Sequence, residues 1–256
     1  MGGGFCEVDG IVTKVIVITG AGKGLGRALA RRFAADGDRV VLMGRTASHL
    51  DALAAEIGDR ALAVPCDVSS PDQVKRAFAT IAERHARIDV LINNAAVYAP
   101  FLVAEATDDQ IVKTIATNLT GAILCTRSGI PMMGRGGYVI NVTSESVDMP
   151  FPHLVLYQTS KAGLEKFSVT LRRELEPSGI RVSFVRAGVM VEPDKAWDID
   201  PVAGMRFAQA AMAAGLNLAE RPMSQVTSVT QIFRNLIDLP PDLQAVSVCL
   251  HARAAD

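Results

Sequence analysis

The 256-residue sequence lacks any apolar run close to the roughly 20 residues that a helix needs to cross a bilayer. It also lacks an excess of charge, because 26 Lys and Arg face 27 Asp and Glu, for a net charge of -1. Such a chain has no overall field that would gather nucleic acid or an anionic membrane, so a local site must bind any anion. We therefore expect neither nucleic acid nor membrane among its partners.

Cysteine and histidine are scarce, with four of each. Cys6, Cys66, Cys125 and Cys249 lie far apart and form no CxxC pair, which is typical of free thiols in a reducing compartment. The histidines are also scattered, so we expect no metal site. Residues 1–12 lack the basic and apolar regions of a secretory signal and are expected to form a flexible tail, which favours a cytoplasmic protein.

The sequence does contain alternating apolar and amphipathic segments. Strands are expected at 14–19, 39–43, 61–65, 88–92, 137–142, 180–186 and 245–250, and helices at 25–36, 48–57, 71–86, 107–129, 156–176 and 224–237. This order predicts an α/β fold, a Rossmann-type doubly wound parallel sheet of about seven strands with helices on both faces, in one domain over residues 1–256. Ligands of such sheets bind beyond the carboxyl ends of the strands.

Residues 188–222 interrupt this alternation. They are irregular apart from an amphipathic patch at 203–214, and they contain the single tryptophan, Trp197, and the acidic residues Asp194, Asp198 and Asp200. Two interpretations are equally open. The segment is either a mobile lid that excludes water from a substrate or a simple packed excursion.

A glycine-rich turn follows the first strand. Its residues Gly20, Gly22, Lys23, Gly24, Leu25 and Gly26 are expected to bind a dinucleotide. Glycines permit the tight turn and leave space where a pyrophosphate approaches, while the following helix N-terminus offers free N–H groups. This strand–turn–helix context predicts a cofactor site.

The second strand ends at Gly44 and Arg45, where a site for NAD would carry a carboxylate for the ribose 2′-hydroxyl. Arg45 can instead bind a 2′-phosphate, and Lys23 is expected on the same side. The cofactor is therefore expected to be NADP(H). The alternative is that both cations are solvated surface charges.

Two further strand ends carry polar residues. Asp67 could accept a hydrogen bond from the adenine amino group, or could simply be a turn residue. Asn94, Ala95 and Ala96 follow the fourth strand, where small side chains would leave room for the ribose and nicotinamide. Asn94 could equally tie loop backbone together.

Tyr157 and Lys161 are four residues apart on an expected helix, so their side chains share a face. A phenol ordinarily has a pKa near 10, and a nearby ammonium would lower the pKa of Tyr157 enough for general acid–base catalysis. Ser144, at the end of the fifth strand, would hydrogen-bond the substrate oxygen. Asn118, a poor helix former within a helix, could hold a water that connects Lys161 to solvent.

The motifs TGAGKGLG, CDV at Cys66–Val68, NNAA, NLTG and YQTSK, with the Ser144–Tyr157 spacing, occur together over residues 14–188. In this combination the chain resembles the short-chain dehydrogenase/reductase family, in its single-domain branch. The resemblance implies a catalytic tetrad of Asn118, Ser144, Tyr157 and Lys161. It also implies that Lys161 binds the nicotinamide ribose, that Asn94 supports the active-site strand, and that Val68 flanks the adenine.

The sequence departs from the family pattern at three positions. Ala96 replaces a glycine, Ala187 replaces the proline that precedes Gly188, and Glu192 replaces a threonine that helps hold the nicotinamide carboxamide. Ala187, Gly188 and Met190 are expected to line the cofactor site, and backbone N–H groups near Val189 could substitute for the threonine. The mostly apolar substrate pocket is expected to be lined by Tyr98, Met149, Phe151, Leu154 and Val189.

These expectations converge on an NADP(H)-dependent ketoreductase or alcohol dehydrogenase that acts on a small, partly apolar metabolite. One alternative is a non-catalytic NADP-binding regulatory protein, and another is an epimerase-type enzyme with transient hydride transfer. The resemblance further implies a homo-oligomer, a dimer or a tetramer formed through the helices at 107–129 and 156–176.

Overall fold

The computed structural model describes residues 13–191 and 199–254. Its main sheet has seven parallel strands in the order β3-β2-β1-β4-β5-β6-β9, as the sequence predicts. The strands are β1 (Val15–Thr19), β2 (Arg39–Gly44), β3 (Ala61–Pro65), β4 (Val90–Asn93), β5 (Tyr138–Ser144), β6 (Arg181–Ala187) and β9 (Ser247–Cys249). The helices are α1 (Gly24–Ala35), α2 (Ala47–Ile57), α3 (Pro71–Arg84), α4 (Asp108–Ile115), α5 (Gly121–Gly129), α6 (Val155–Leu175), α7 (Pro201–Ala213) and α8 (Val226–Ile237).

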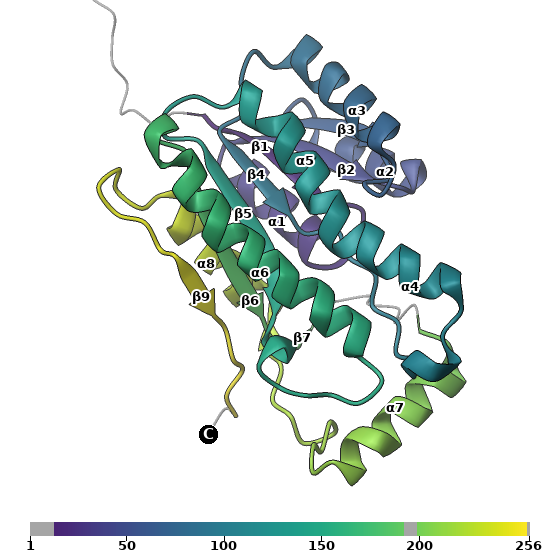
Figure 1. The fold of residues 1–256 in the computed structure, drawn as a ribbon. Helices are drawn as coiled ribbons and strands as arrows, with labels where there is room; N and C mark the ends of the chain where they lie inside the picture. Colours follow the sequence, from purple (N-terminus) through teal and green to yellow (C-terminus); the bar gives the residue numbers. More distant parts are fainter. Residues whose placement is uncertain (1–12, 192–198, 255–256) are drawn as a thin grey trace, which may run out of the picture.

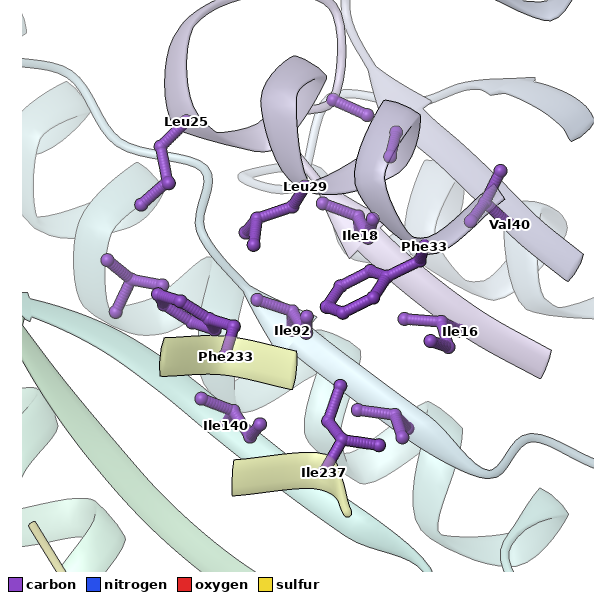
Figure 2. Packing of buried hydrophobic residues seen from close by; sticks show 14 of the residues in the cluster. Ile16, Ile18, Leu25, Leu29, Phe33, Val40, Ile92, Ile140, Phe233 and Ile237 are labelled. Carbon is purple, nitrogen blue, oxygen red and sulfur yellow. The ribbon is translucent and has the colours of Figure 1, made fainter. Parts of the chain in front are cut away.

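The sheet is covered on both faces because alternate residues of each strand point to opposite sides. Ile16 and Ile18 pack with Phe33 of α1 and Phe233 of α8 on one face (Figure 2). Val17, between them, packs on the other face with residues of α3 and α5. This two-sided burial explains why the strands are apolar almost throughout.

Two elements of the expected fold need correction. The helix expected at 107–129 does start with Thr107, whose side chain and that of Gln110 form a capping box. It is not one α-helix, however, because a π-helical turn at Ala116–Thr120 separates α4 from α5. That π-helical turn contains Asn118, whose side chain forms hydrogen bonds with Val97 in a neighbouring loop.

The segment 188–222 is also more regular than expected. The short strand β7 (Met190–Val191) pairs with β8 (Ser224–Gln225), so the last helix begins at Val226 rather than Ser224. Helix α7 is a full helix, whose start is capped by the Asp200 side chain accepting from the N–H of Ala203. Figure 1 shows α7 at one end of the molecule, beyond the strand ends. The expected tail at 1–12, together with Glu192, Asp194, Trp197 and Asp198, lies outside the described residues.

Within the two described ranges, no helix has both the length and the apolar character that a membrane span requires. The strand order places β1 and β4 side by side, although β2 and β3 intervene along the chain. The connections therefore leave in opposite directions from the carboxyl ends of β1 and β4. A crevice at that position is where this type of sheet binds its ligands.

Candidate functional site

One cleft, of about 1370 Å³, runs along the carboxyl edge of the sheet from the glycine-rich turn to α7. It brings together most of the predicted site residues. Those that line it are Gly22, Lys23, Gly24, Leu25, Arg45, Asn94, Ala96, Tyr98, Ser144, Phe151, Leu154, Tyr157, Lys161, Ala187, Gly188, Val189 and Met190. Residues more than 160 positions apart in the sequence thus share a single cleft.

Some predicted site residues do not line the cleft. They are Gly20, Gly26, Asp67, Val68, Ala95, Asn118 and Met149. Each has a structural contact that accounts for its position, and the most informative of these contacts are described below.

The glycine-rich turn is held against the loop after β4 by very close backbone contacts. Gly20 has a φ of 69°, and a Cβ there would lie 2.9 Å from the Cα of Ala95. A Cβ on Gly26 would lie 2.4 Å from the carbonyl oxygen of Gly20. The Nδ2 of Asn94 donates to the carbonyl oxygen of Thr19 at 2.9 Å, so Asn94 ties the two loops together. These contacts shape the turn from behind, while Gly22 and Gly24 face the cleft.

The end of the cleft near this turn is rich in cations. Arg45 and Lys23 line it as predicted, and so do Arg27 and Arg31 of α1, which sequence reasoning missed. Arg31 is already engaged by a bidentate ion pair with Glu56 of α2, with N–O distances of 2.7 and 2.8 Å. The i, i+4 spacing of Lys23, Arg27 and Arg31 would have been a usable signal, because it places all three on one face. This end is suited to a polyanion such as a phosphorylated dinucleotide.

Asp67 is a turn residue. Its Oδ1 accepts from the backbone N–H and the hydroxyl of Ser69, at 2.9 and 2.7 Å. Burial acts to raise the pKa of Asp67, but these hydrogen bonds and the charges of Arg45 and Lys113 lower the pKa overall. Val68 is buried, and a Cβ on Gly121 would lie 2.8 Å from its side chain. Val68 therefore packs α5 against the loop after β3.

At the centre of the cleft, Tyr157 and Lys161 project from the same face of α6, as their spacing predicts. The Nζ of Lys161 lies 5.8 Å from the centre of the Tyr157 ring and donates to the carbonyl oxygen of Val142 at 2.8 Å. Lys161 is only 2% exposed, and burial lowers its pKa to about 8. The amine therefore lies near the ring of Tyr157, whose acid–base chemistry it is expected to assist.

The expectation that Lys161 lowers the pKa of Tyr157 is wrong for this structure. Burial of the phenol raises the pKa, and a hydrogen bond with Ser144 offsets that rise only in part. Tyr157 thus holds its proton at neutral pH. Ser144 itself accepts hydrogen bonds from the backbone N–H and the hydroxyl of Ser146, at 3.2 and 2.9 Å. These contacts orient the Ser144 hydroxyl beside the phenol.

Asn118 lies behind the site rather than on the wall of the cleft. Its Oδ1 accepts from the N–H of Val97 at 2.8 Å, and its Nδ2 donates to the carbonyl oxygen of Val97 at 3.0 Å. The same Nδ2 donates to Ser160 Oγ at 3.1 Å. Since both amide hydrogens are used within the protein, the side chain fixes the loop after β4 to α6.

The far end of the cleft is apolar and aromatic. The rings of Tyr98 and Tyr157 meet edge to face with centres 5.0 Å apart, and Tyr98 also meets Phe207 of α7. Phe151 and Leu154 belong to the same cluster. Met149 packs against this cluster without lining the cleft, which corrects its expected place. Sequence reasoning missed Phe207 because an amphipathic pattern does not show which surface a helix covers.

Glu145 and Arg221 form an ion pair on the wall of this apolar end, at 2.6 Å. Glu145 is buried, and Arg221 also lies over the ring of Phe151, 5.3 Å from its centre. Neither residue was predicted. A carboxylate directly after Ser144 was a local signal for Glu145, but nothing in the sequence links it to Arg221, 76 positions later.

A seven-stranded parallel sheet covered on both faces, with a glycine-rich turn and a cationic cleft at the β1–β4 crevice, defines a Rossmann-type nucleotide-binding protein. The model of the short chain dehydrogenase family matches residues 14–199. The chain belongs to the short-chain dehydrogenase/reductase family of oxidoreductases.

Relatives with known names fit this assignment. A 3-oxoacyl-[acyl-carrier-protein] reductase of Synechocystis sp. is 34% identical over 184 residues, which cover 70% of this chain and 74% of that protein. A serine 3-dehydrogenase of Agrobacterium fabrum is 35% identical over 178 residues, which cover 68% of this chain and 71% of that protein.

Solved structures are similar over nearly the whole chain. A short-chain dehydrogenase from Streptomyces avermitilis has a TM-score of 0.82 at 27% identity and covers 94% of this chain and 89% of its own. A short chain dehydrogenase from Burkholderia cenocepacia, in complex with NADP, has a TM-score of 0.79 at 25% identity and covers 93% and 96%.

Proposed function

We propose that this oxidoreductase uses NADP(H) to interconvert a carbonyl and a secondary alcohol on a small, partly apolar metabolite. One observation carries the proposal: Ser144, Tyr157 and Lys161 line the same cleft as the cationic, glycine-rich turn. A cofactor on that turn and a substrate at the aromatic end would therefore meet beside the Tyr157 hydroxyl. The named relatives are reductases or dehydrogenases of this family, which also favours such a reaction.

The residues of the cationic end fit NADP(H). Side chains are missing where the turn comes closest to its neighbours, since Cβ atoms on Gly20 and Gly26 would clash with backbone. Arg45 stands at the end of β2, where it can hydrogen-bond a 2′-phosphate. Lys161 and the backbone of Ala187, Gly188 and Met190 are the candidates for holding the nicotinamide half.

NADPH, when bound, supplies a hydride to the carbonyl carbon. Tyr157 donates its proton to the substrate oxygen as negative charge develops there, and Ser144 hydrogen-bonds the same oxygen. The raised pKa of Tyr157 keeps the phenol protonated at neutral pH, which is the form that can donate to the substrate oxygen. Lys161, with its pKa lowered to about 8, is the group that would resupply that proton. Asn118 acts as a positioning residue through Val97 and Ser160.

The decisive experiment follows NADPH absorbance over a panel of ketones, aldehydes and keto acids with partly apolar chains. Cofactor consumption that depends on both the carbonyl compound and Tyr157 would support the proposal. Binding of NADPH with no consumption on any compound would favour a regulatory protein. Substrate conversion without net cofactor consumption would favour an epimerase-type reaction.

The proposal includes a homo-oligomer. Helices α4 and α6 expose Val112 and Val155, which are 65% and 50% accessible in the single chain. Exposed apolar residues on α4 and α6 suit a self-association surface. Light scattering during size-exclusion chromatography would distinguish a dimer or tetramer from a monomer.

A further inference from the structure

The end of the last strand carries a cluster of nucleophilic and titratable side chains beside the cleft. The Sγ of Cys249 lies 3.2 Å from Nε2 of His251, and Nδ1 of the same ring lies 3.2 Å from Oε2 of Glu145. Cys249 is exposed, the His251 side chain is 60% exposed, and the Glu145 side chain is 7% exposed. One imidazole therefore links a solvent-accessible sulfur to a buried carboxylate.

Strand pairing brings these residues together. β9 lies parallel to β6 with Cys249 opposite Arg186, and the N–H of Leu250 donates to the carbonyl oxygen of Arg186 at 3.0 Å. The absence of a side chain at Gly188 leaves room for the segment that follows β9, which begins with Leu250. A Cβ at that position would lie 2.8 Å from the carbonyl oxygen of Leu250 and 3.1 Å from Oε2 of Glu145.

The geometry matches the requirements of an activated thiol. A thiol becomes nucleophilic when a neighbouring base takes its proton and a third group orients that base. His251 can accept the proton on Nε2, while Glu145 accepts from Nδ1 and stabilises the imidazolium. We infer that Cys249 is a reactive thiol, modified by low-molecular-weight disulfides, with His251 as its base and Glu145 as the orienting carboxylate.

The surrounding charges are compatible with an anionic sulfur. Arg186 is opposite Cys249 in the strand register and carries ion pairs to Glu165 and Asp148. The hydrogen bond to Glu165 and the charges of Glu165 and Asp148 raise the pKa of Arg186, so a guanidinium cation lies beside this strand end. Arg221 binds the other oxygen of Glu145, so this carboxylate faces a cation on each side once His251 is protonated.

The reaction is a thiol–disulfide exchange. The Sγ of Cys249 attacks one sulfur of the disulfide, the old S–S bond breaks, and a mixed disulfide forms on the protein. The proton of Cys249 passes to His251 and then to the departing thiolate, which leaves as a free thiol. Cys249 is oxidised and the departing sulfur is reduced, so no further oxidant is needed.

The other described cysteines provide internal references. Cys66 and Cys125 are buried, and burial raises the pKa of both thiols, that of Cys66 to about 11. A thiol that is both inaccessible and protonated exchanges slowly. Selectivity for Cys249 over Cys66 and Cys125 is therefore expected in the folded protein.

The test is the rate of modification of the full-length protein by glutathione disulfide near neutral pH, without cofactor or substrate. Its outcome is thus independent of the proposed function. Tryptic residues 235–253 contain Cys249 as their only cysteine, so mass spectrometry resolves this site from the others. The synthetic peptide 235–253 gives the rate of the same thiol without the fold.

We expect the folded protein to react about five- to tenfold faster at Cys249 than the free peptide does. His251→Ala should abolish that advantage, and Glu145→Gln should reduce it. His85→Ala, which alters a histidine at the end of α3, should leave the rate unchanged. Equal rates for the protein and the peptide, or for wild type and His251→Ala, would overturn the inference.

Discussion

The amine of Lys161 donates a hydrogen bond to the main-chain carbonyl of Val142, with an Nζ–O distance of 2.8 Å. This bond joins the helix that carries Tyr157 to the strand that ends at Ser144. The buried amine is thereby held where the helix of Tyr157 meets the strand of Ser144. The first two predictions concern this arrangement.

Replacing Tyr157 with Phe removes the proposed proton donor while leaving the ring in place. We expect kcat/KM for carbonyl reduction to fall by about 10²- to 10⁴-fold, the usual contribution of a general acid. The NADPH dissociation constant, measured by fluorescence titration, should change little. Tyr98→Phe is the matched control, because its ring meets that of Tyr157 edge to face, and it should cost far less. Full turnover by Tyr157→Phe would refute the proton-transfer role.

The pKa of Lys161, lowered to about 8, predicts the pH dependence of reduction. The protonated amine is the form that can resupply the phenol, and it is lost as pH rises through that value. The reductive kcat should therefore be constant below about pH 7 and fall above about pH 8. Lys161→Arg stays charged throughout and should remove this fall from whatever activity remains. A wild-type rate that stays constant to about pH 10 would contradict the role of Lys161.

Arg45 is predicted to select NADP(H) over NAD(H). One charge-assisted hydrogen bond is worth about 1.5–3 kcal/mol, so Arg45→Ala should reduce the preference by roughly 10- to 150-fold. The ratio of kcat/KM for the two cofactors measures the effect. Arg39→Ala, at the opposite end of the same strand, is the control and should leave the ratio unchanged. Equal use of both cofactors by the wild type would sink this assignment.

Asn118→Ala should weaken the structure behind the cleft. The substitution leaves the N–H and carbonyl of Val97 without their side-chain partner, at a cost of about 1–3 kcal/mol in the free energy of unfolding. Urea denaturation would measure this loss. A double-mutant cycle with Ser160→Ala should give a coupling energy of at least about 0.5 kcal/mol, since the two side chains share a hydrogen bond. Strictly additive changes in the free energy of unfolding would argue against a stabilising hydrogen bond between Asn118 and Ser160.

Arg186 and Glu165 form a bidentate ion pair, with side chains 20% and 11% exposed. Glu165→Gln leaves the guanidinium poorly compensated and should lower the free energy of unfolding by about 2–4 kcal/mol. The matched control is Glu56→Gln in the exposed pair with Arg31, which should cost less than about 1 kcal/mol. Similar losses in both variants would show that burial does not determine how much each ion pair contributes to the free energy of unfolding.

The sequence by itself determined the sheet and the central pair of the site. Short, almost continuous apolar runs predict the strands, because the strands of a parallel sheet are buried on both faces. The spacing of Tyr157 and Lys161 is a helical repeat and needs no tertiary information. The glycine-rich turn is likewise local, since it is built from consecutive residues.

Only the tertiary structure decided the rest. The role of Asn118 could not be predicted, because its partner, Val97, comes from another loop. The pKa of Tyr157 rises rather than falls because burial depends on everything packed around the phenol. The ion pair of Glu145 with Arg221, and the approach of His251 to the same carboxylate, join residues that no local pattern relates. Contacts between distant segments depend on how the helices and strands pack, and that packing depends on residues from the entire sequence rather than on any local pattern.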